Sequence, residues 1–188
     1  MSRAPGPTLT TERLILRPPD LADVEPWSAF MSSEASSFIG GPVPRLRGWG
    51  TLMSGAGDWA LRGFGMFSVV ERESGRWIGR VGPVHPEGWP GTEVGWAIVP
   101  EAQGKGYAFE AAVASMQWVV DTLGWTEIIH TIHPDNFISQ RLARKLGSTH
   151  SGIGKLPPPN EDHSVDIWRQ SADQWRAGAL AADRKRHA

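Results

Sequence analysis

One short segment organises this chain: Gln103-Gly104-Lys105-Gly106-Tyr107-Ala108. The apolar run before it, residues 93–99, predicts a strand, and residues 108–123 predict a helix with small or apolar side chains at helical spacing. Main-chain N–H groups at a helix start have no partner within the helix, and the helix dipole adds positive potential there. The two glycines allow positive φ and a close approach to the main chain. Strand, turn and helix together therefore predict an anion-binding loop that can hold a phosphate.

The spacing within this segment argues against two common nucleotide-binding loops. A dinucleotide fingerprint needs a small residue where this chain has Phe109. A P-loop needs a glycine where Val99 stands, and a Ser or Thr directly after the lysine, where Gly106 stands. Nucleotide binding by this loop is therefore disfavoured.

Two further segments agree with the loop. Asn136-Phe137-Ile138-Ser139 follows a second predicted strand, residues 127–132, and opens a short helix ending at Leu146-Gly147. The pattern Gln103-x-x-Gly106-x-Ala108 resembles the acyl-CoA loop of the GCN5-related N-acetyltransferases (GNAT), and the Asn-x-x-Ser…Leu-Gly segment is similar to one in the same superfamily. Residues 11–18, Thr-Glu-Arg-Leu-Ile-Leu-Arg-Pro, are similar to the first strand of its RimJ/RimL-like, ribosomal-protein-acetylating branch. The resemblance covers roughly residues 8–170.

The resemblance implies a fold. We expect one α/β (α+β) acetyltransferase domain over residues 1–188, with a core at about 8–170 and a C-terminal helical tail at about 171–188, opened by Ser171 as a cap. A central mixed, mostly antiparallel sheet should contain a splayed parallel pair and be flanked by helices. The parallel neighbours should be the strands at 93–99 and 126–132, because a helix of about 16 residues connects them. The glycine-rich residues 40–65 predict short helical pieces joined by turns.

Composition narrows the function classes. The chain has 188 residues, 40% of them hydrophobic, and a net charge of −1, which fits a globular domain and argues against a broad electrostatic surface for nucleic acid. It contains no cysteine, so a thiolate metal site and a cysteine nucleophile are excluded and no metal is expected. No run approaches the ~18 apolar residues of a membrane span, and residues 1–7 lack the apolar core of a secretory signal. We expect a cytoplasmic monomer or homodimer that binds neither nucleic acid nor membrane.

The resemblance also implies a reaction. An acetyl group moves from acetyl-CoA, the cosubstrate, to a primary amine by direct transfer through a ternary complex. The acceptor is a protein N-terminus or a small-molecule amine. The amine must lose a proton, and the carbonyl oxygen needs N–H donors as it gains charge. A non-catalytic acyl-CoA-binding sensor or scaffold is the alternative.

The expected cofactor residues lie in three places. The loop should hold the pyrophosphate through main-chain N–H groups. By resemblance, the main chain of the preceding strand end pairs with the pantetheine amides, with one N–H facing the thioester oxygen, and the second motif contacts the pantetheine arm. The cofactor-binding set is Ile98, Val99, Gln103, Gly104, Lys105, Gly106, Tyr107, Ala108, Asn136 and Ser139. From the residues alone, Asn136 is equally well explained as a helix N-cap.

The catalytic candidates are Ser139 and Glu93. Many superfamily members have a tyrosine near positions 142–143, whereas the only tyrosine here is Tyr107. The resemblance therefore makes Ser139 the residue that hydrogen-bonds or protonates the departing sulfur. Glu93 is the predicted base, with His85, His133 or water as alternatives, and His130 is predicted to be a packed histidine inside its strand.

Two groups of side chains complete the predicted site. Ten tryptophans stand against one tyrosine, and by resemblance five of them lie in segments that bound the acceptor: Trp27, Trp49, Trp59, Trp89 and Trp96. Most buried tryptophans belong to the core, and Trp96 has the best claim to the acceptor pocket. The candidates for the 3′-phosphate of CoA are Lys105, Arg141, Arg144 and Lys145.

Overall fold

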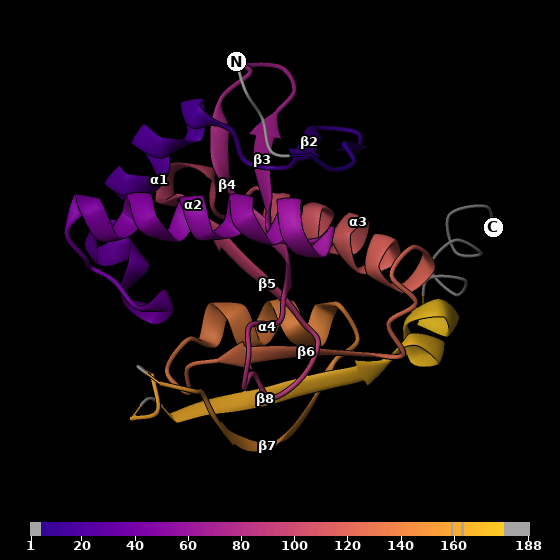
Figure 1. Cartoon of the computed structure of the whole chain (residues 1–188). Helices are drawn as coiled ribbons and strands as arrows, with labels where there is room; N and C mark the ends of the chain where they lie inside the picture. Colours follow the sequence, from indigo (N-terminus) through magenta and orange to yellow (C-terminus); the bar gives the residue numbers. More distant parts are fainter. Residues whose placement is uncertain (1–4, 159, 163, 179–188) are drawn as a thin grey trace. The chain divides into compact units, whose positions relative to one another are not determined.

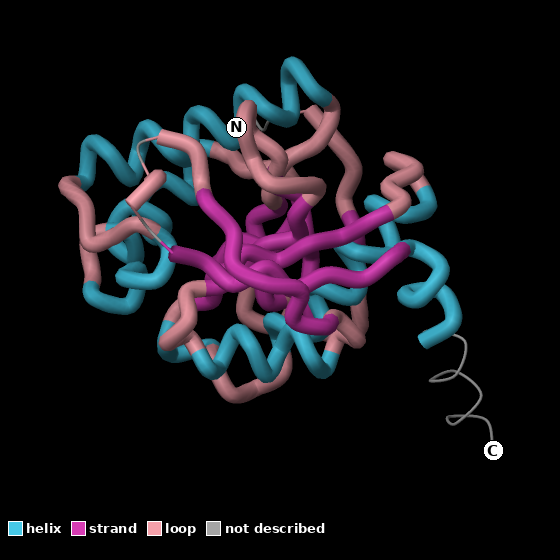
Figure 2. The backbone as a smooth tube through the Cα atoms, turned by 90° about the horizontal axis from the view of Figure 1, so that it is seen from below, coloured by secondary structure: helices cyan, strands magenta, loops and turns pink. Residues whose placement is uncertain are grey.

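A computed structural model describes residues 5–158, 160–162 and 164–178. Figures 1 and 2 show the helices and strands of the backbone. The elements are β1 (Leu9–Thr10), β2 (Leu14–Arg17), η1 (Leu21–Asp23), α1 (Val24–Met31), η2 (Glu34–Ile39), α2 (Arg45–Arg62), β3 (Phe67–Glu71), β4 (Trp77–Val84), β5 (Glu93–Ile98), η3 (Pro100–Ala102), α3 (Tyr107–Asp121), β6 (Glu127–Ile132), α4 (Phe137–Lys145), β7 (Thr149–Lys155) and β8 (Ser164–Ser171). Among the described residues, no helix is both long and apolar enough to cross a membrane.

The sheet is mixed and mostly antiparallel. Its strand order is β1-β2-β3-β4-β5-β6-β8-β7. β5 and β6 are parallel, with Glu93 opposite Ile129, whereas the pairs β1–β2, β2–β3, β3–β4, β6–β8 and β7–β8 are antiparallel. These findings confirm the predicted sheet, its parallel pair and its flanking helices. The splaying of the two parallel strands stays a prediction.

Contacts along the chain group the residues into two compact units. The first unit comprises the chain up to residue 84 and residues 95–115; the second comprises residues 85–94 and the chain from residue 116 onward. The expectation of a single domain stays a prediction.

The first unit is built on β2, β3 and β4. β2 buries Leu14 and Leu16 and leaves Ile15 and Arg17 half-buried, as alternate sides of a strand do. Asp20 caps η1 in a reciprocal capping box with Asp23. Helices α1 and α2 lie side by side in Figure 1 and share a hydrophobic cluster with the end of β5. The buried members of this cluster are Trp27, Phe30, Met31, Leu52 and Ala97.

The prediction for residues 40–65 is wrong, because α2 is one continuous helix of 18 residues. Glycine disfavours helices by roughly 1 kcal/mol per residue, yet two glycines of α2 have a packing role. A Cβ on Gly48 would lie 3.1 Å from Ser28 Cα, and a Cβ on Gly55 would lie 2.5 Å from an Arg80 Nη2 atom. Burial of Leu52 and Trp59 on the same helix stabilises it against its low propensity. Tertiary packing thus outweighs local sequence preference.

The second unit is built on β6, β7 and β8. β8 pairs with β6 on one side and with β7 on the other. Ile129 of β6 and Val165 and Ile167 of β8 form a buried hydrophobic cluster. Residues 172–178 form a helix. Ser171 Oγ accepts a hydrogen bond from Gln174 N at 3.1 Å, and Gln174 Oε1 accepts one from Ser171 N at 2.8 Å. The predicted cap at Ser171 is therefore confirmed, whereas residues 179–188 of the predicted tail lie outside the described residues.

Candidate active site

The glycine loop in the first unit has the conformation its sequence predicts. Gly104 has φ +74° and Gly106 has φ +83°, and α3 begins directly afterwards at Tyr107. In the described part of the chain, the main-chain N–H groups of residues 104–106 donate no hydrogen bond. The first N–H groups of α3 follow them in sequence and also have no intrahelical acceptor. The loop therefore presents consecutive unpaired donors, which is the chemistry of an anion site.

Side chains from the start of the chain fix this loop. Arg13 donates from Nη1 to the Lys105 carbonyl at 2.9 Å and from Nε to a Glu110 carboxylate oxygen at 2.7 Å, and its guanidinium lies 4.6 Å from the Tyr107 ring centroid. Burial opposes ionisation of Glu110, but hydrogen bonds from Thr11 and Arg13 outweigh it and lower the pKa of this carboxyl. The glycine pattern does not reveal this anchor, because it depends on residues nearly a hundred positions apart.

Tyr107 is not available as a substitute for the missing family tyrosine. It is the first residue of α3 and is buried, and its hydroxyl donates to a Glu71 carboxylate oxygen at 2.5 Å. This hydrogen bond raises the pKa of the Tyr107 phenol. The side chain therefore braces the loop against β3, and any role of Tyr107 toward a cofactor would come from its main chain.

At the strand end before the loop, several main-chain groups are hydrogen-bonded within the protein. The Val99 N–H donates to the Ile78 carbonyl at 3.0 Å, and the Val99 carbonyl accepts from Ala102 N at 3.0 Å. Gln103 Nε2 donates to the Ile98 carbonyl at 2.8 Å and so stabilises the turn. The Val99 N–H is thus bonded within the protein, and the N–H expected to face the thioester oxygen at this strand end stays a prediction.

In the second unit, Glu93 lies in a buried pocket of donors. The residue is 6% exposed. Its Oε2 accepts from Trp89 Nε1 at 2.5 Å and from Thr131 Oγ1 at 2.8 Å, and its Oε1 accepts from Thr131 N at 3.2 Å. Burial raises the pKa of Glu93 to about 7, and the hydrogen bonds from Trp89 and Thr131 oppose the rise. A carboxyl with this pKa can both take and release a proton near neutral pH.

The raised pKa of Glu93 predicts a pH-dependent stability. Between the ordinary pKa of 4.5 and about 7, the folded chain holds a proton that the unfolded chain has lost. The folded state therefore binds more protons in this window, and its stability falls as pH rises, by on the order of 3 kcal/mol in total. Relative to Glu93→Gln, the wild-type free energy of unfolding should fall between pH 4.5 and 8, as measured by urea denaturation. A difference that stays constant over this range would contradict the assignment.

His130 is packed inside its strand, as the sequence predicts, whereas the alternative base His133 is partly exposed. His130 is buried; its Nδ1 lies 2.7 Å from the Val94 carbonyl and its Nε2 lies 3.0 Å from Ser148 Oγ. Burial lowers the pKa of His130 to about 4. A carbonyl can only accept, so Nδ1 carries the proton and the ring is neutral. His133 is partly exposed and its Nδ1 accepts from Asp135 N at 3.1 Å.

The second motif forms the start of α4. Asn136 Oδ1 accepts a hydrogen bond from Ser139 N at 3.1 Å, so Asn136 is the N-cap of α4. Ser139 lies in the first turn and is half-buried, and Ala143 is fully buried one turn later. The cap explains Asn136 structurally, and its contact with a pantetheine arm stays a prediction.

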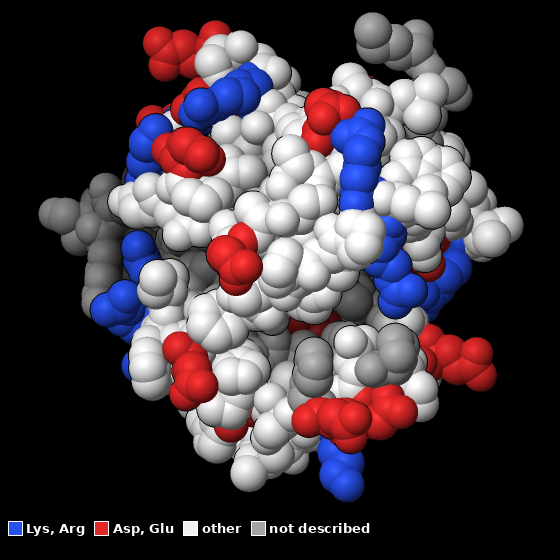
Figure 3. Space-filling model, turned by 90° about the vertical axis from the view of Figure 1, so that its left-hand side faces the viewer, with Lys and Arg blue, Asp and Glu red and all other residues white. Residues whose placement is uncertain are grey.

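The basic residues of α4 do not form one group. Arg144 lies over the Trp168 ring, 5.0 Å from its centroid, and donates to Gln140 Oε1 at 3.4 Å. Arg141 and Lys145 are exposed on other positions of the helix. On the face shown in Figure 3, Lys and Arg side chains are mixed with Asp and Glu, as the net charge of −1 suggests.

The tryptophans divide between core and site. Trp27 and Trp59 are buried core residues, whereas Trp49 is 45% exposed. Trp96 is half-buried. Trp89 donates a hydrogen bond to Glu93, and the sequence did not predict this contact. Two residues four positions apart across a Pro-Gly turn are too common to indicate a hydrogen bond between their side chains. Thr131 was missed for the same reason, since its contact with Glu93 comes from strand pairing.

Comparisons with known proteins agree with this geometry. Residues 13–149 match the family model of the acetyltransferase (GNAT) domain. A Bacillus subtilis (strain 168) protein described as "Uncharacterized N-acetyltransferase YnaD" is 30% identical over 160 residues, covering 81% of this chain and 90% of that protein. The crystal structure of an acetyltransferase from Agrobacterium tumefaciens str. C58 is 34% identical with a TM-score of 0.77, covering 87% of this chain and 94% of that one. Mycobacterium smegmatis RimJ, solved in complex with CoA-disulfide, shares the fold with a TM-score of 0.71 at 19% identity, covering 93% and 91%. The chain therefore belongs to the GNAT family and is an acetyl-CoA-dependent N-acetyltransferase.

Proposed function

We propose that this enzyme transfers the acetyl group directly from acetyl-CoA to a primary amine within a ternary complex. The acceptor is a protein N-terminus or a small-molecule amine. The observation that carries the proposal is the row of unpaired N–H groups at residues 104–106 leading into α3. The RimJ/RimL-like branch and a cytoplasmic location remain predictions from the sequence.

The cofactor would be held mainly by main-chain groups. The N–H groups from Gly104 to Ala108 would bind the pyrophosphate, with the positive end of the α3 dipole behind them. Gln103 shapes the turn through the Ile98 carbonyl. The pantetheine arm would follow the main chain at Ile98 and Val99 and the α4 start at Asn136. Since the donors at the pyrophosphate are main-chain groups, most side-chain changes in the loop should leave affinity intact, except at the glycines.

The chemistry would rest on Glu93 and Ser139. Glu93, with its pKa near 7, accepts the proton that the amine loses, directly or through one water. The neutral amine nitrogen forms the new bond to the thioester carbon, and the carbon–sulfur bond breaks. Ser139 donates a hydrogen bond to the sulfur as its negative charge develops. No covalent enzyme intermediate is needed, which suits a chain without cysteine.

A loop variant tests the cofactor site. Acetyl-CoA should raise the melting temperature of the wild-type chain, because a ligand that binds only the folded state stabilises it. Gly106→Val places a β-branched residue at φ +83°, a conformation that such residues avoid. The loop must therefore change shape, and its main-chain N–H groups would no longer point together at the pyrophosphate. We expect acetyl-CoA affinity to fall at least about tenfold and the thermal shift to disappear.

The matched control is Gly63→Val. Gly63 also has a positive φ, +73°, and a Cβ there has open space, but it lies at the end of α2. This variant carries similar backbone strain and should keep the acetyl-CoA shift. If Gly106→Val binds acetyl-CoA as tightly as the wild type, the cofactor does not occupy this loop.

A further inference from the structure

The Glu93 carboxylate joins two segments of the second unit, the loop at residues 85–92 and strand β6. Its Oε2 accepts from Trp89 Nε1 at 2.5 Å and from Thr131 Oγ1 at 2.8 Å, and its Oε1 accepts from Thr131 N at 3.2 Å. An ionised carboxylate offers roughly four lone-pair positions, about two on each oxygen. Within the described residues, both positions on Oε2 are therefore occupied, and one position on Oε1 is left to accept a proton.

The pairing of β5 with β6 determines where this carboxylate lies. The two parallel strands are in register at Glu93 and Ile129. In a regular parallel ladder, the next N–H of β6 that points toward β5, that of Thr131, would bond to the main chain of β5. Here it donates to Glu93 Oε1, while the Val94 carbonyl accepts from His130 Nδ1 at 2.7 Å. The carboxylate thus takes the place of a main-chain acceptor, and the strand register fixes its position.

Trp89 supplies a donor from the other side, in the loop at residues 85–92. This loop packs closely on β6, because a Cβ on Gly91 would lie 3.2 Å from the Ile129 side chain. Trp89 itself is half-buried, and its indole N–H reaches the oxygen of Glu93 that also accepts from the Thr131 hydroxyl. The carboxylate is therefore held between two elements of the second unit.

Hydrogen bonds and burial, rather than charges, control the ionisation of Glu93. Burial raises its pKa to about 7, and the bonds from Trp89 and Thr131 oppose the rise. Within the described part of the chain, no charged side chain contributes to this pKa. The ionisable residues on the neighbouring elements are His85 and Glu87 of the loop, Glu127 and His130 of β6, and Asp166 and Arg169 of β8.

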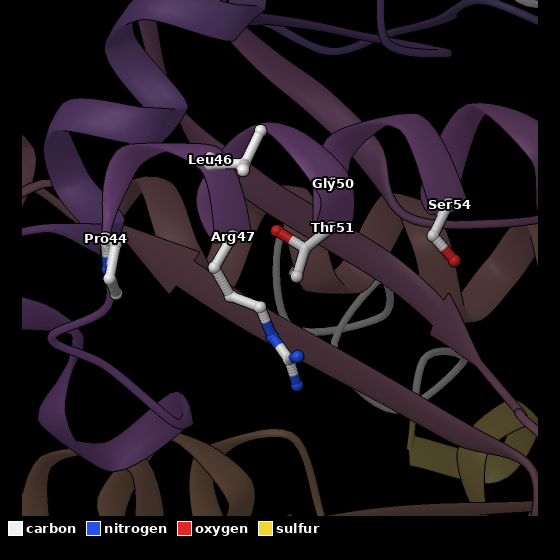
Figure 4. A pocket seen from close by; sticks show the side chains of 6 residues that line it. All are labelled: Pro44, Leu46, Arg47, Gly50, Thr51 and Ser54. Carbon is white, nitrogen blue, oxygen red and sulfur yellow. The ribbon is translucent and has the colours of Figure 1, made fainter.

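The groove along α2, in the first unit, supplies no group that could replace Glu93. Its volume is about 550 Å³, and its lining residues are Pro44, Leu46, Arg47, Gly50, Thr51 and Ser54. Figure 4 shows the side chains of Arg47, Thr51 and Ser54 extending from α2. The lining includes neither a carboxylate nor a histidine, the usual general bases.

We propose that Thr131 and Trp89 are positioning residues for Glu93, and that they hold its carboxylate so that the open lone pair on Oε1 receives the proton of the amine. This inference rests on the proposed role of Glu93 as the base and adds the residues that control it. Hydrogen bonds to an ionised group are stronger than those to a neutral one. Each donor therefore favours the form of Glu93 that can accept a proton, and without them the buried carboxyl would stay protonated at neutral pH.

Thr131→Val tests the hydroxyl, because valine keeps the β-branched shape. Loss of a hydrogen bond to the charged form should raise the pKa of Glu93 by roughly one to two pH units. From a wild-type pKa near 7, kcat/KM at pH 7 should then fall about fivefold or more, and the deficit should shrink toward pH 9. Thr131→Ser restores a hydroxyl and should recover most of the rate. A purely structural defect would lower the rate at every pH.

Trp89→Phe removes the indole N–H and should move the pH profile in the same direction. Its control is Trp168→Phe, since Trp168 is also buried but its Nε1 has no hydrogen-bond partner within the described residues. The control for Thr131→Val is Thr92→Val, because the Thr92 hydroxyl donates to the Glu127 carbonyl at 2.6 Å. Both controls should keep the wild-type profile. Turnover is measured as CoA release with a panel of alkylamines, arylalkylamines and short peptides that have a free N-terminus.

Carbon-13 NMR of the carboxyl groups reads the ionisation of Glu93 without an acceptor. The signal of Glu93 is the one that Glu93→Gln lacks. Its midpoint should lie near pH 7 in the wild type and in both controls, and roughly one to two pH units higher in Thr131→Val and Trp89→Phe. An unchanged midpoint in one of these variants removes that residue from the assignment, and unchanged midpoints in both overturn it.

The two proposals fail in different ways. If the Glu93 midpoint rises in Thr131→Val and Trp89→Phe while the pH profile of kcat/KM does not move, Glu93 is not the base and the proposed chemistry fails, although the two residues hold the carboxylate. If the rate falls equally at every pH and the midpoint stays near 7, the contacts are only structural and the inference fails.

Discussion

Replacing Glu93 by glutamine should lower kcat/KM about a hundredfold at neutral pH, the usual contribution of a general base. Glutamine has the same shape and can still accept from Trp89 and Thr131, the two residues that hold the carboxylate. The fold should therefore survive while the group that takes the proton is lost. Steady-state kinetics with a confirmed acceptor measures the change.

The pH dependence makes this prediction specific. With the pKa of Glu93 near 7, wild-type kcat/KM should rise with pH through neutrality as the carboxyl loses its proton. The variant should lack this limb, so its deficit relative to the wild type should be largest above pH 7, where the wild-type carboxylate is ionised, and should shrink at low pH. Glu127→Gln is the control, because Glu127 is a surface carboxylate of β6 paired with Arg169; it should keep the wild-type profile. If Glu93→Gln keeps the wild-type rate and pH profile, Glu93 is not the general base, and water, His85 or His133 takes the proton instead.

Replacing Ser139 by alanine should lower kcat by roughly 30–150-fold, equivalent to about 2–3 kcal/mol of lost transition-state stabilisation. The hydrogen bond to sulfur strengthens only as negative charge develops, so acetyl-CoA affinity should change little. The Ser139 N–H donates to Asn136 Oδ1, and alanine keeps this N–H, so the cap of α4 persists. Single-turnover kinetics and calorimetry with CoA separate the two effects.

Ser139→Thr is the matched variant, because it restores a hydroxyl at the same place and should recover part of the rate. If Ser139→Ala turns over at the wild-type rate, the sulfur takes its proton from water. The enzyme would then work by holding the two reactants in register, an effect large enough to support catalysis alone.

The sequence predicted those parts of the protein that depend on local pattern. Gly104 and Gly106 adopt the positive φ that their spacing suggested, Asn136 and Ser171 cap helices, and the helix between β5 and β6 correctly implied a parallel pair. In each case a few neighbouring residues determine the geometry, so no knowledge of distant contacts is needed.

The parts that the sequence did not predict depend on contacts between distant residues. α2 forms because Gly48 and Gly55 fit against α1 and Arg80, which propensity cannot anticipate. The Val99 N–H is bonded because β4 passes beside it at Ile78. Thr131 reaches Glu93 across a strand pair, and the burial of Arg80 follows from the packing of α2. Register and packing, rather than composition, decide these features.

The anchor between Arg13 and the start of α3 connects the β1–β2 segment to the loop for which we propose cofactor binding. Arg13 touches both Lys105 and Glu110, so the shape of the loop and the attachment of the β1–β2 segment are linked equilibria. Linkage is reciprocal: whatever holds the loop in its binding shape also holds this edge of the sheet in place, and loosening the edge weakens the loop by the same free energy. If the loop holds the cofactor as proposed, the strands β1 and β2 contribute to its affinity without touching it.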